Sequence, residues 1–360
     1  RRQRQMCIRD RGSCVVKQPT ITAFSLGLNG NAITVSNSLY QRMCETDPES
    51  MATSPVTAQA LKKVIDENKL AGLPQLTFAT VFPVSNHNYQ LRYWMASAGI
   101  DPDRDVRLIV IPPPYMAANL ESGKIDGFCV GEPWNTRAVR MGIGRILICG
   151  YEIWNNSPER VLGIKLSWAE KHPNTHRALI MALLEACAWI DQAENREEVI
   201  QILASDRYIN THVEDITPSL TGKLRYGQGD DPVPVNDFSV FHRYAANFPW
   251  RSHAEWIITQ MYRWGQIDQL TDIQALASQI YRPDIYREAA KALGMSAPLL
   301  DRKPEGEHSA SWLLSDATQP IKMGADQFFD GKYYDAKDPL GYLKGFTLQN
   351  LAADTAAKLS

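Results

Sequence analysis

The chain has 360 residues, of which 44% are hydrophobic and 22% are charged, a composition typical of globular proteins with one large domain or two lobes. Its formal net charge of −2 argues against nucleic acid as the main partner, because phosphate neutralisation requires an excess of basic residues. The sequence contains no run of about 18 apolar residues, so no segment is expected to span a membrane.

The first residues, RRQRQMCIRDRGSC, are rich in arginine and lack the apolar core of a complete secretory signal. Residues 1–18 are therefore predicted to be a basic tail, or a junction foreign to the domain that follows. Six cysteines occur in the whole chain without a CxxC pair or zinc-type spacing. We expect buried or incidental thiols and no metal site, and the sequence leaves a single disulfide open.

From Pro19 onward the pattern becomes typical of a folded domain. ITAFSLGL (21–28) and AITVSN (32–37) are predicted strands, separated by a turn-forming NGN. Residues 45–59 are polar, contain two prolines and are expected to form a loop. ALKKVIDENKL (60–70) has the spacing of an amphipathic helix and is followed by a glycine stop.

Strands and helices then alternate along the chain with short connections. Apolar runs such as LIVI and ILIC are typical of strands that are buried on both faces. This alternation predicts an α/β fold, with a parallel sheet covered by helices on both faces. The predicted strands are 76–81, 105–111, 125–130 and 145–150.

After a further strand at 160–165 the character changes. A long helix is predicted from HPNTHRALIMALL onward, with Pro173 in its first turn. Residues 194–300 are expected to be mostly helical, and residues 301–360 to be rich in loops.

Three segments follow predicted strands and lead directly into helix N-termini: FPVSNHN, PPP and GEPW. Ligands of open α/β sheets bind beyond the carboxyl ends of strands, and a helix N-terminus favours an anion. His87 could therefore donate a hydrogen bond to a ligand oxygen. The alternative is a surface histidine beside a capping residue.

In the third segment, Gly131 would let a ligand approach the backbone closely, and Trp134 would either wall a cleft or pack in the core. Glu132 is unfavourable for an anion site, and it could orient a donor, bind a cation or stabilise the helix N-terminus. Arg160 is a candidate positive charge, and its alternative is a solvated pair with Glu159. The sequence contains no nucleotide-binding, serine-hydrolase or zinc-protease motif, so we predict neither catalysis nor a cofactor.

Four stretches resemble the nitrate-binding and bicarbonate-binding solute proteins of ABC transporters. They are TFATVFPVSNHNYQLRYWMASAGI, DVRLIVIPPPYMAANLESGKIDGFCVGEPWN, FPWRSHAEWIITQMYRWG and FFDGKYYDAKDPLGYL. The resemblance runs from about residue 19 to the C-terminus. It implies a two-lobed periplasmic-binding-protein fold of type II, which captures a small anion by hinge closure for permease and ATPase subunits. It also implies a periplasmic place, or attachment to the outer face of the inner membrane.

The resemblance also implies a domain division. Residues 37–159 would form one lobe, and residues 19–36 with 160–360 the other, with 32–36 and 160–165 as crossovers. A family member has more of this second lobe before residue 19, so the lobe is expected to be incomplete and to expose apolar surface within 166–300.

By position in the matching motifs, the resemblance implies ligand contacts from His87, Pro113, Gly131 and Arg160, with Asn31 as a further candidate. The nitrate-type pattern has Lys where Arg160 stands, which keeps the charge but changes the hydrogen-bond geometry.

Nitrate or nitrite is predicted over bicarbonate, because nitrate has only acceptor oxygens and needs donors and positive charge. Glu132 and Glu159 keep bicarbonate open, since its O–H needs an acceptor. Two other hypotheses for the function are a cytoplasmic nitrate sensor of the same fold and an enzyme related to pyrimidine-precursor synthases. The enzyme reading would need a clustered His/Cys or cofactor-binding set, which the sequence does not contain.

Overall fold

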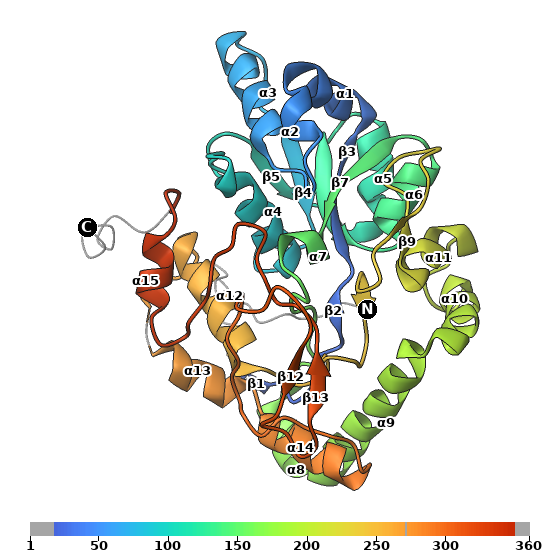
Figure 1. The fold of residues 1–360 in the computed structure, drawn as a ribbon, viewed down its shortest axis with the longest axis vertical. Helices are drawn as coiled ribbons and strands as arrows, with labels where there is room; N and C mark the ends of the chain where they lie inside the picture. The colour runs from blue at the N-terminus through green and yellow to red at the C-terminus, as the bar shows by residue number, and fades with distance from the viewer. Residues whose placement is uncertain (1–17, 271, 350–360) are drawn as a thin grey trace.

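The computed structural model describes residues 18–270 and 272–349. Its largest sheet has five strands in the order β5-β4-β6-β3-β7 and lies among helices in the upper part of the molecule as drawn in Figure 1. The strands are β3 (Asn31–Ser36), β4 (Thr77–Thr80), β5 (Arg107–Val110), β6 (Gly127–Gly131) and β7 (Gly144–Cys149). The predicted tail of residues 1–18 lies outside the described residues except for Gln18.

The sheet is mixed, which corrects the prediction of a parallel sheet. β4 is parallel to β5 and to β6, as the strand–helix alternation predicted, but β3 is antiparallel to both β6 and β7. The register places Asn31, the first residue of β3, opposite Gly131, the last residue of β6. β3 therefore enters the sheet at the edge where the parallel strands end, and it must run against them.

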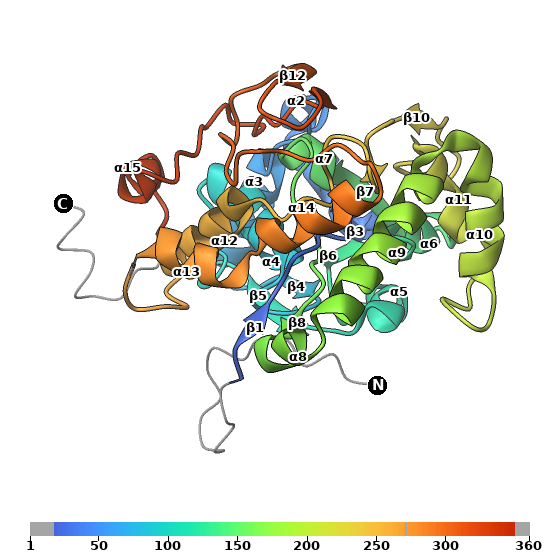
Figure 2. The same ribbon diagram turned by 90° about the horizontal axis from the view of Figure 1, so that it is seen from below.

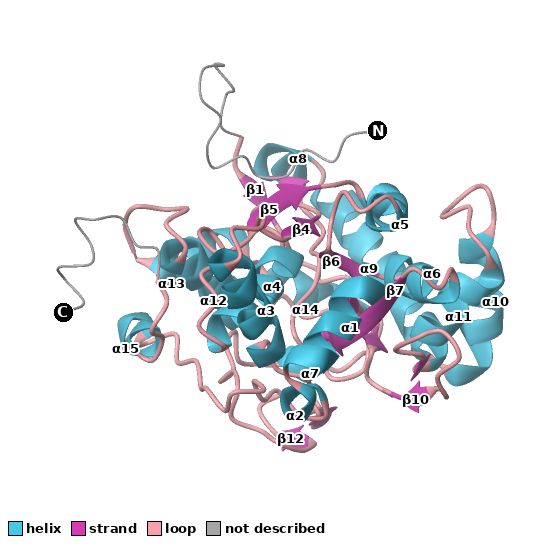
Figure 3. Ribbon diagram, turned by 90° about the horizontal axis from the view of Figure 1, so that it is seen from above, coloured by secondary structure: helices cyan, strands magenta, loops and turns pink. Residues whose placement is uncertain are grey.

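Helices cover both faces of the sheet, as predicted (Figure 3). Successive side chains of a strand point to opposite faces. Cys129 accordingly packs in the core under α1, α3 and α4, whereas Phe128 and Val130 pack in a second core with residues of α5 and α6. The helices are α1 (Asn37–Thr46), α3 (Gln59–Leu70), α4 (Asn86–Ser97), α5 (Met116–Glu121) and α6 (Trp134–Arg140).

The loop predicted over 45–59 is partly helical. α1 extends to Thr46, and α2 (Pro48–Met51) follows directly, because the Asp47 side chain accepts a hydrogen bond from the backbone N–H of Ser50 and Pro48 suits a first helical turn. The polar composition of this segment had favoured a loop, and it gave no indication of the short capped helix.

The strands predicted at 21–28 and 160–165 are shorter than expected but lie side by side. Only β1 (Thr20–Ile21) and β2 (Leu28–Asn29) form in the first, and β8 (Ile164–Lys165) forms in the second. β1 pairs with β8, and the backbone N–H of Leu26 donates to the carbonyl oxygen of Arg160 at 2.8 Å. Two antiparallel segments thus join the sheet to the rest of the molecule.

The remainder is mainly helical. Pro173 begins α9, as predicted, and α9 packs against α14 through Ile180, Leu184 and Tyr286 (Figure 2). The range 194–300 is less helical than predicted, because the Gly- and Pro-rich stretch 222–250 forms only short strands. The helices are α7 (Gly150–Ile153), α8 (Leu166–Lys171), α9 (Pro173–Asp191), α10 (Arg196–Ala204), α11 (Val213–Thr221), α12 (Arg251–Arg263), α13 (Ile273–Ile280), α14 (Pro283–Ala292) and α15 (Pro339–Lys344).

The short strands are β9 (Lys223–Leu224), β10 (Val233–Pro234), β11 (Ser239–Val240), β12 (Trp312–Leu314) and β13 (Ile321–Met323), and two single-turn helices span Pro113–Tyr115 and Ala193–Asn195. The predicted loop-rich C-terminal region contains only β12, β13 and α15 among its described residues. Within 166–300 the exposed large apolar side chains are Leu179, Ile202, Tyr208, Val233, Leu276, Leu299 and Leu300. Only Leu299 and Leu300 are adjacent in the sequence, and single exposed apolar side chains are common on protein surfaces. No helix within the described ranges is long and apolar enough to cross a bilayer.

The cysteines that the structure describes, Cys44, Cys129, Cys149 and Cys187, are free thiols. Cys7 and Cys14 lie outside the described residues. Burial raises the pKa of both Cys129 and Cys149, which keeps these two thiols protonated and unreactive.

Candidate anion-binding site

The N-terminus of α4 carries a buried histidine without a partner. Ser85 caps the helix by accepting a hydrogen bond from the backbone N–H of Asn88 at 3.3 Å. His87 is only 7% exposed, and neither of its ring nitrogens has a hydrogen-bond partner among the described residues. Since buried polar groups are normally satisfied, this imidazole has hydrogen-bonding capacity left for a ligand.

The charge state of His87 follows from its surroundings. Burial lowers its pKa, Glu159 raises it and Arg160 lowers it further. His87 is therefore neutral at pH 7, with one N–H donor and one acceptor nitrogen. The predicted alternative of a satisfied surface histidine is wrong, because the side chain is buried and both nitrogens are unpartnered.

Gly131 and Asn31 lie side by side at the end of β6 and the start of β3. A Cβ atom on Gly131 would lie 3.4 Å from Oδ1 of Asn31 and 3.6 Å from Nη2 of Arg160. Nη2 of Arg160 therefore lies close to the glycine backbone, at a distance where a single methyl group would just fit. These three predicted residues come together, and Glu159 and Arg160 are the neighbours whose charges act on His87.

Glu159 was predicted either to form a solvated pair with Arg160 or to offer an acceptor for bicarbonate. Its side chain is only 10% exposed, and its Oε1 accepts a hydrogen bond of 2.5 Å from Nδ2 of Asn31. Its Oε2 lies 3.4 Å from Nε of Arg160, whose own side chain is 66% exposed. The predicted Glu159–Arg160 pair is thus present, but only the arginine is solvated.

A polar network behind Asn31 was not predicted. The amide of Gln90 accepts from Asn31 Nδ2 at 3.4 Å and donates to Oγ of Ser157 at 3.0 Å, and the backbone N–H of Ser157 donates to Asn29 at 2.9 Å. Gln90 could have been found from the sequence, because it follows His87 by three positions and so shares its helix face. No sequence pattern indicated that Ser157 and Asn29 belong to this network.

Pro113 stands apart from this cluster. It begins the single-turn helix after β5, the edge strand, and β4 lies between β5 and β6 in the sheet. Its place as a ligand contact therefore stays a prediction.

The structure shows which of its three predicted roles Glu132 has. Its two carboxylate oxygens accept hydrogen bonds from the backbone N–H and the hydroxyl of Thr136, both at 3.0 Å, so Glu132 stabilises the start of α6. Burial raises the pKa of Glu132 to about 7. Trp134 is half-buried against the core formed by Ala79 and Phe128, which favours the packing role over the cleft wall.

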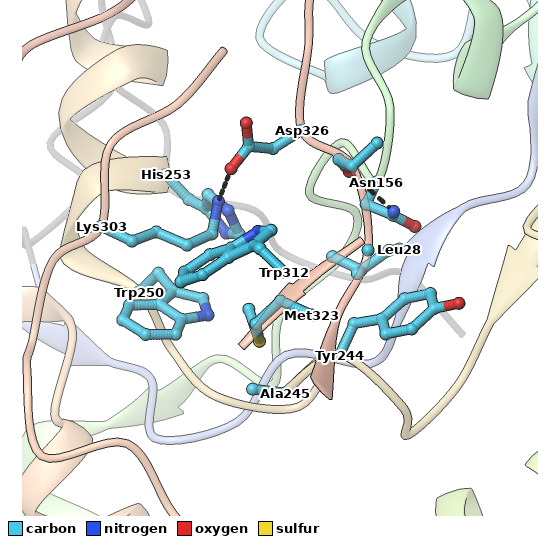
Figure 4. Close-up of a pocket in the computed structure, with 12 residues that line it drawn as sticks. Leu28, Asn156, Tyr244, Ala245, Trp250, His253, Lys303, Trp312, Met323 and Asp326 are labelled. Atoms are coloured by element: carbon cyan, nitrogen blue, oxygen red, sulfur yellow. Dashed lines mark hydrogen bonds and ion pairs between the residues drawn. The ribbon is translucent and has the colours of Figure 1, made fainter. Parts of the chain in front are cut away.

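A small pocket elsewhere is a poorer candidate (Figure 4). It lies where the C-terminal region meets the segment before α12, and Trp250, Trp312 and Met323 supply its apolar lining. Its cation, Lys303, contacts Glu305 at 2.5 Å and lies 3.8 Å from Asp326. Two carboxylates therefore surround the one ammonium group, and the resulting net negative charge is unfavourable for an anion. No group of three or more His, Cys, Asp or Glu residues suited to a metal ion occurs in the described part of the chain.

The buried histidine predicts a pH effect on stability. Because the pKa of His87 is lower in the folded than in the unfolded protein, the unfolded state binds more protons once the pH falls below about 6.5. The free energy of unfolding should be highest above that pH and should fall below it, by at most about 1.4 kcal/mol per pH unit for this residue. His87→Gln, which cannot take the proton, should flatten this fall in urea titrations between pH 7.5 and 5. The same change at exposed His212 is the control, and an unaltered slope in His87→Gln would contradict the assignment.

Comparisons with known proteins identify the family of the chain. The model of the NMT1-like family matches residues 4–204, more than half of the chain. The nitrate/nitrite binding protein NrtA of Synechococcus elongatus is 37% identical over 91% of this chain and 68% of its own length. The nitrate import ATP-binding protein NrtC of Synechocystis is 38% identical over 92% of the chain but only 44% of its own length. The bicarbonate-binding protein CmpA of Synechococcus elongatus is 29% identical over 92% of the chain and 70% of its own length.

Among solved structures, the periplasmic nitrate-binding protein NrtA from Synechocystis PCC 6803 superposes with a TM-score of 0.78 at 29% identity, covering 92% of this chain and 78% of that one. This match confirms the predicted α/β fold of periplasmic solute-binding proteins, and the sequence matches confirm the predicted resemblance. The chain spans less than half of NrtC and about two thirds of NrtA. It belongs to the NMT1-like family and is a relative of the nitrate/nitrite binding protein NrtA.

Proposed function

We propose that this protein is the solute-binding component of an ABC importer for nitrate and nitrite, and that it captures the anion without chemical change. The proposed ligand contacts are His87, Gly131, Arg160, Asn31 and Pro113. The observation that carries the proposal is the buried His87 without hydrogen-bond partners, which shares a cluster with Arg160 and Glu159. Nitrate has only acceptor oxygens, and the helix N-terminus, the imidazole N–H and the guanidinium group are all donors.

Capture would use relative motion of two parts of the molecule. The paired segments 20–29 and 158–165 are the proposed connection, because they join the sheet to the mainly helical remainder. Arg160 lies on one of them, next to the strand end that carries Gly131. A small rotation there would change the distance between Arg160 and the sheet, which gives the closed state its extra affinity.

The proposed partners are the permease and ATPase subunits of the transporter, and the proposed place is the periplasm or the outer face of the inner membrane. The names of the relatives support both proposals, since one is a nitrate import ATP-binding protein and another is a periplasmic nitrate-binding protein. The same names favour transport over a cytoplasmic sensor and over an enzyme.

Bicarbonate is the second candidate. The carboxylate of Glu159 is an acceptor that could take the O–H of bicarbonate, and CmpA is a relative named for binding this anion. Glu159 already accepts from Asn31 and pairs with Arg160, so its capacity is largely used, and we place nitrate first.

The test is isothermal titration of the full-length protein with nitrate, nitrite and bicarbonate at constant ionic strength. Tight binding of nitrate and nitrite, with bicarbonate at least about tenfold weaker (1.4 kcal/mol), is expected. Tight binding of bicarbonate alone would assign the second candidate. No heat with any of the three would refute the proposal.

A substitution at Gly131 tests the space in front of Arg160. In Gly131→Ala, the new methyl group would make only ordinary contacts with Asn31 and Arg160, so the fold should be retained. The methyl group would nevertheless occupy the space proposed for the anion, and nitrate affinity should fall at least about tenfold.

Gly345→Ala is the matched control for Gly131→Ala. Its Cβ would lie 3.3 Å from the carbonyl oxygen of Tyr342, a slightly tighter contact, at the end of α15 and outside both the site and the proposed connection. Both variants should melt within a few degrees of the unsubstituted protein. Equal nitrate affinities in the two variants would show that the anion does not bind next to Gly131.

A further inference from the structure

Glu159 is an unexpected neighbour for an anion. Its carboxylate is nine-tenths buried, is held by Asn31 at 2.5 Å, and belongs to the group of charges that act on His87. Burying a carboxylate is costly, and placing it beside an anion adds repulsion. The ion pair with Arg160 offsets only part of this cost, because the arginine side chain is 66% exposed.

The side-chain charges of the proposed site sum to about zero. Arg160 contributes one positive charge and Glu159 one negative charge, while His87 is held neutral by its burial. Glu132 lies next to Gly131, and any charge on it is negative, so it does not reverse the balance. A singly charged anion therefore enters a site without excess positive charge, and a doubly charged anion would leave two negative charges uncompensated.

We propose that Glu159 is a specificity-determining residue that restricts this site to singly charged anions and excludes sulfate. The inference rests on the proposed function. Sulfate offers the same kind of acceptor oxygens as nitrate, so donors alone cannot reject it. A negative charge at Glu159 can reject sulfate, because the Coulomb energy between Glu159 and a ligand is proportional to the charge of the ligand. Asn31 gives the carboxylate a fixed position from which to act.

This proportionality gives a quantitative expectation for Glu159→Gln. Glutamine has nearly the same shape and keeps an oxygen for the hydrogen bond from Asn31, so chiefly the charge is lost. The logarithm of the affinity gain should be twice as large for sulfate as for nitrate. If nitrate binds about 5-fold more tightly in the variant, sulfate should bind about 25-fold more tightly.

The experiment measures nitrate and sulfate affinities of the full-length protein, its Glu159→Gln variant and a Glu170→Gln control, at pH 7.5 and constant ionic strength set with chloride. Glu170 lies exposed on α8, so its substitution changes the net charge equally without entering the site. Sulfate is followed directly and by its displacement of nitrate. A preferential gain for sulfate in Glu159→Gln, absent from the control, supports the inference.

Other outcomes overturn it. Equal factors for the two anions, or a common loss of affinity, would make Glu159 only a positioning residue for Asn31. If the unsubstituted protein binds nitrate but Glu159→Gln gives one of these two results, the proposed function stands and this inference fails. If the unsubstituted protein binds none of nitrate, nitrite and bicarbonate, the proposed function has failed, and sulfate binding by Glu159→Gln alone decides the inference.

Discussion

Arg160→Ala is expected to weaken nitrate binding at least about 100-fold, a loss of about 2.7 kcal/mol. The variant loses the guanidinium group that lies close to Gly131, and with it the positive charge of the cluster. It also leaves the carboxylate of Glu159 without its ion-pair partner, so the anion would meet a bare negative charge. Titration calorimetry measures the effect, and thermal unfolding should change little, because the arginine side chain is largely exposed.

Two companion variants separate these causes. Arg160→Lys keeps the charge without the planar geometry and should retain affinity within about tenfold of the unsubstituted protein. Arg160→Ala combined with Glu159→Gln should bind nitrate more tightly than Arg160→Ala alone, because the bare carboxylate is gone. Unchanged binding in Arg160→Ala would remove this residue from the site and reopen the choice of anion.

Glu305→Ala is expected to lower the free energy of unfolding by about 3–5 kcal/mol. Glu305 is fully buried and accepts a hydrogen bond from Oγ of Ser252 at 2.7 Å, while Lys303 lies 2.5 Å and His253 3.4 Å away. Burial by itself raises the pKa of Glu305, but Lys303 and His253 together lower it to about 2. Removing the carboxylate would leave a buried ammonium group near Asp326 alone, which costs more than the lost contact.

Urea unfolding measures this loss, with Glu307→Ala as the control, since Glu307 is exposed two residues away. Because the folded pKa of Glu305 is depressed, its contribution should be full above about pH 4.5 and should be lost as the pH falls towards 2. Nitrate affinity of the folded variant should be unchanged, because Glu305 is not a member of the site. A loss no larger than that of Glu307→Ala would show that the buried charges do not secure the C-terminal region to α12.

The order of elements around the site could be predicted from the sequence. Buried apolar runs followed by helix-starting segments identified β4, β6 and the helices after them, because strand and helix periods are local properties of the chain. Parallel strands end at a common sheet edge, so the chain order alone placed His87 and Gly131 on that edge. Arg160 was a candidate because of its charge, and the family resemblance then added Asn31.

Contacts between distant residues required the tertiary structure. No local pattern reports that β3 runs against its neighbours, or that Asn31 meets Glu159 across 128 positions. From the sequence, both Glu132 and Glu159 kept bicarbonate open as a ligand. In the structure, Glu132 stabilises the start of α6, whereas Glu159 accepts a hydrogen bond from Asn31. Sequence periodicity determined which segments are strands and helices and which ends they share. Only packing decided which side chains are left without partners, because hydrogen-bond satisfaction depends on every neighbour at once.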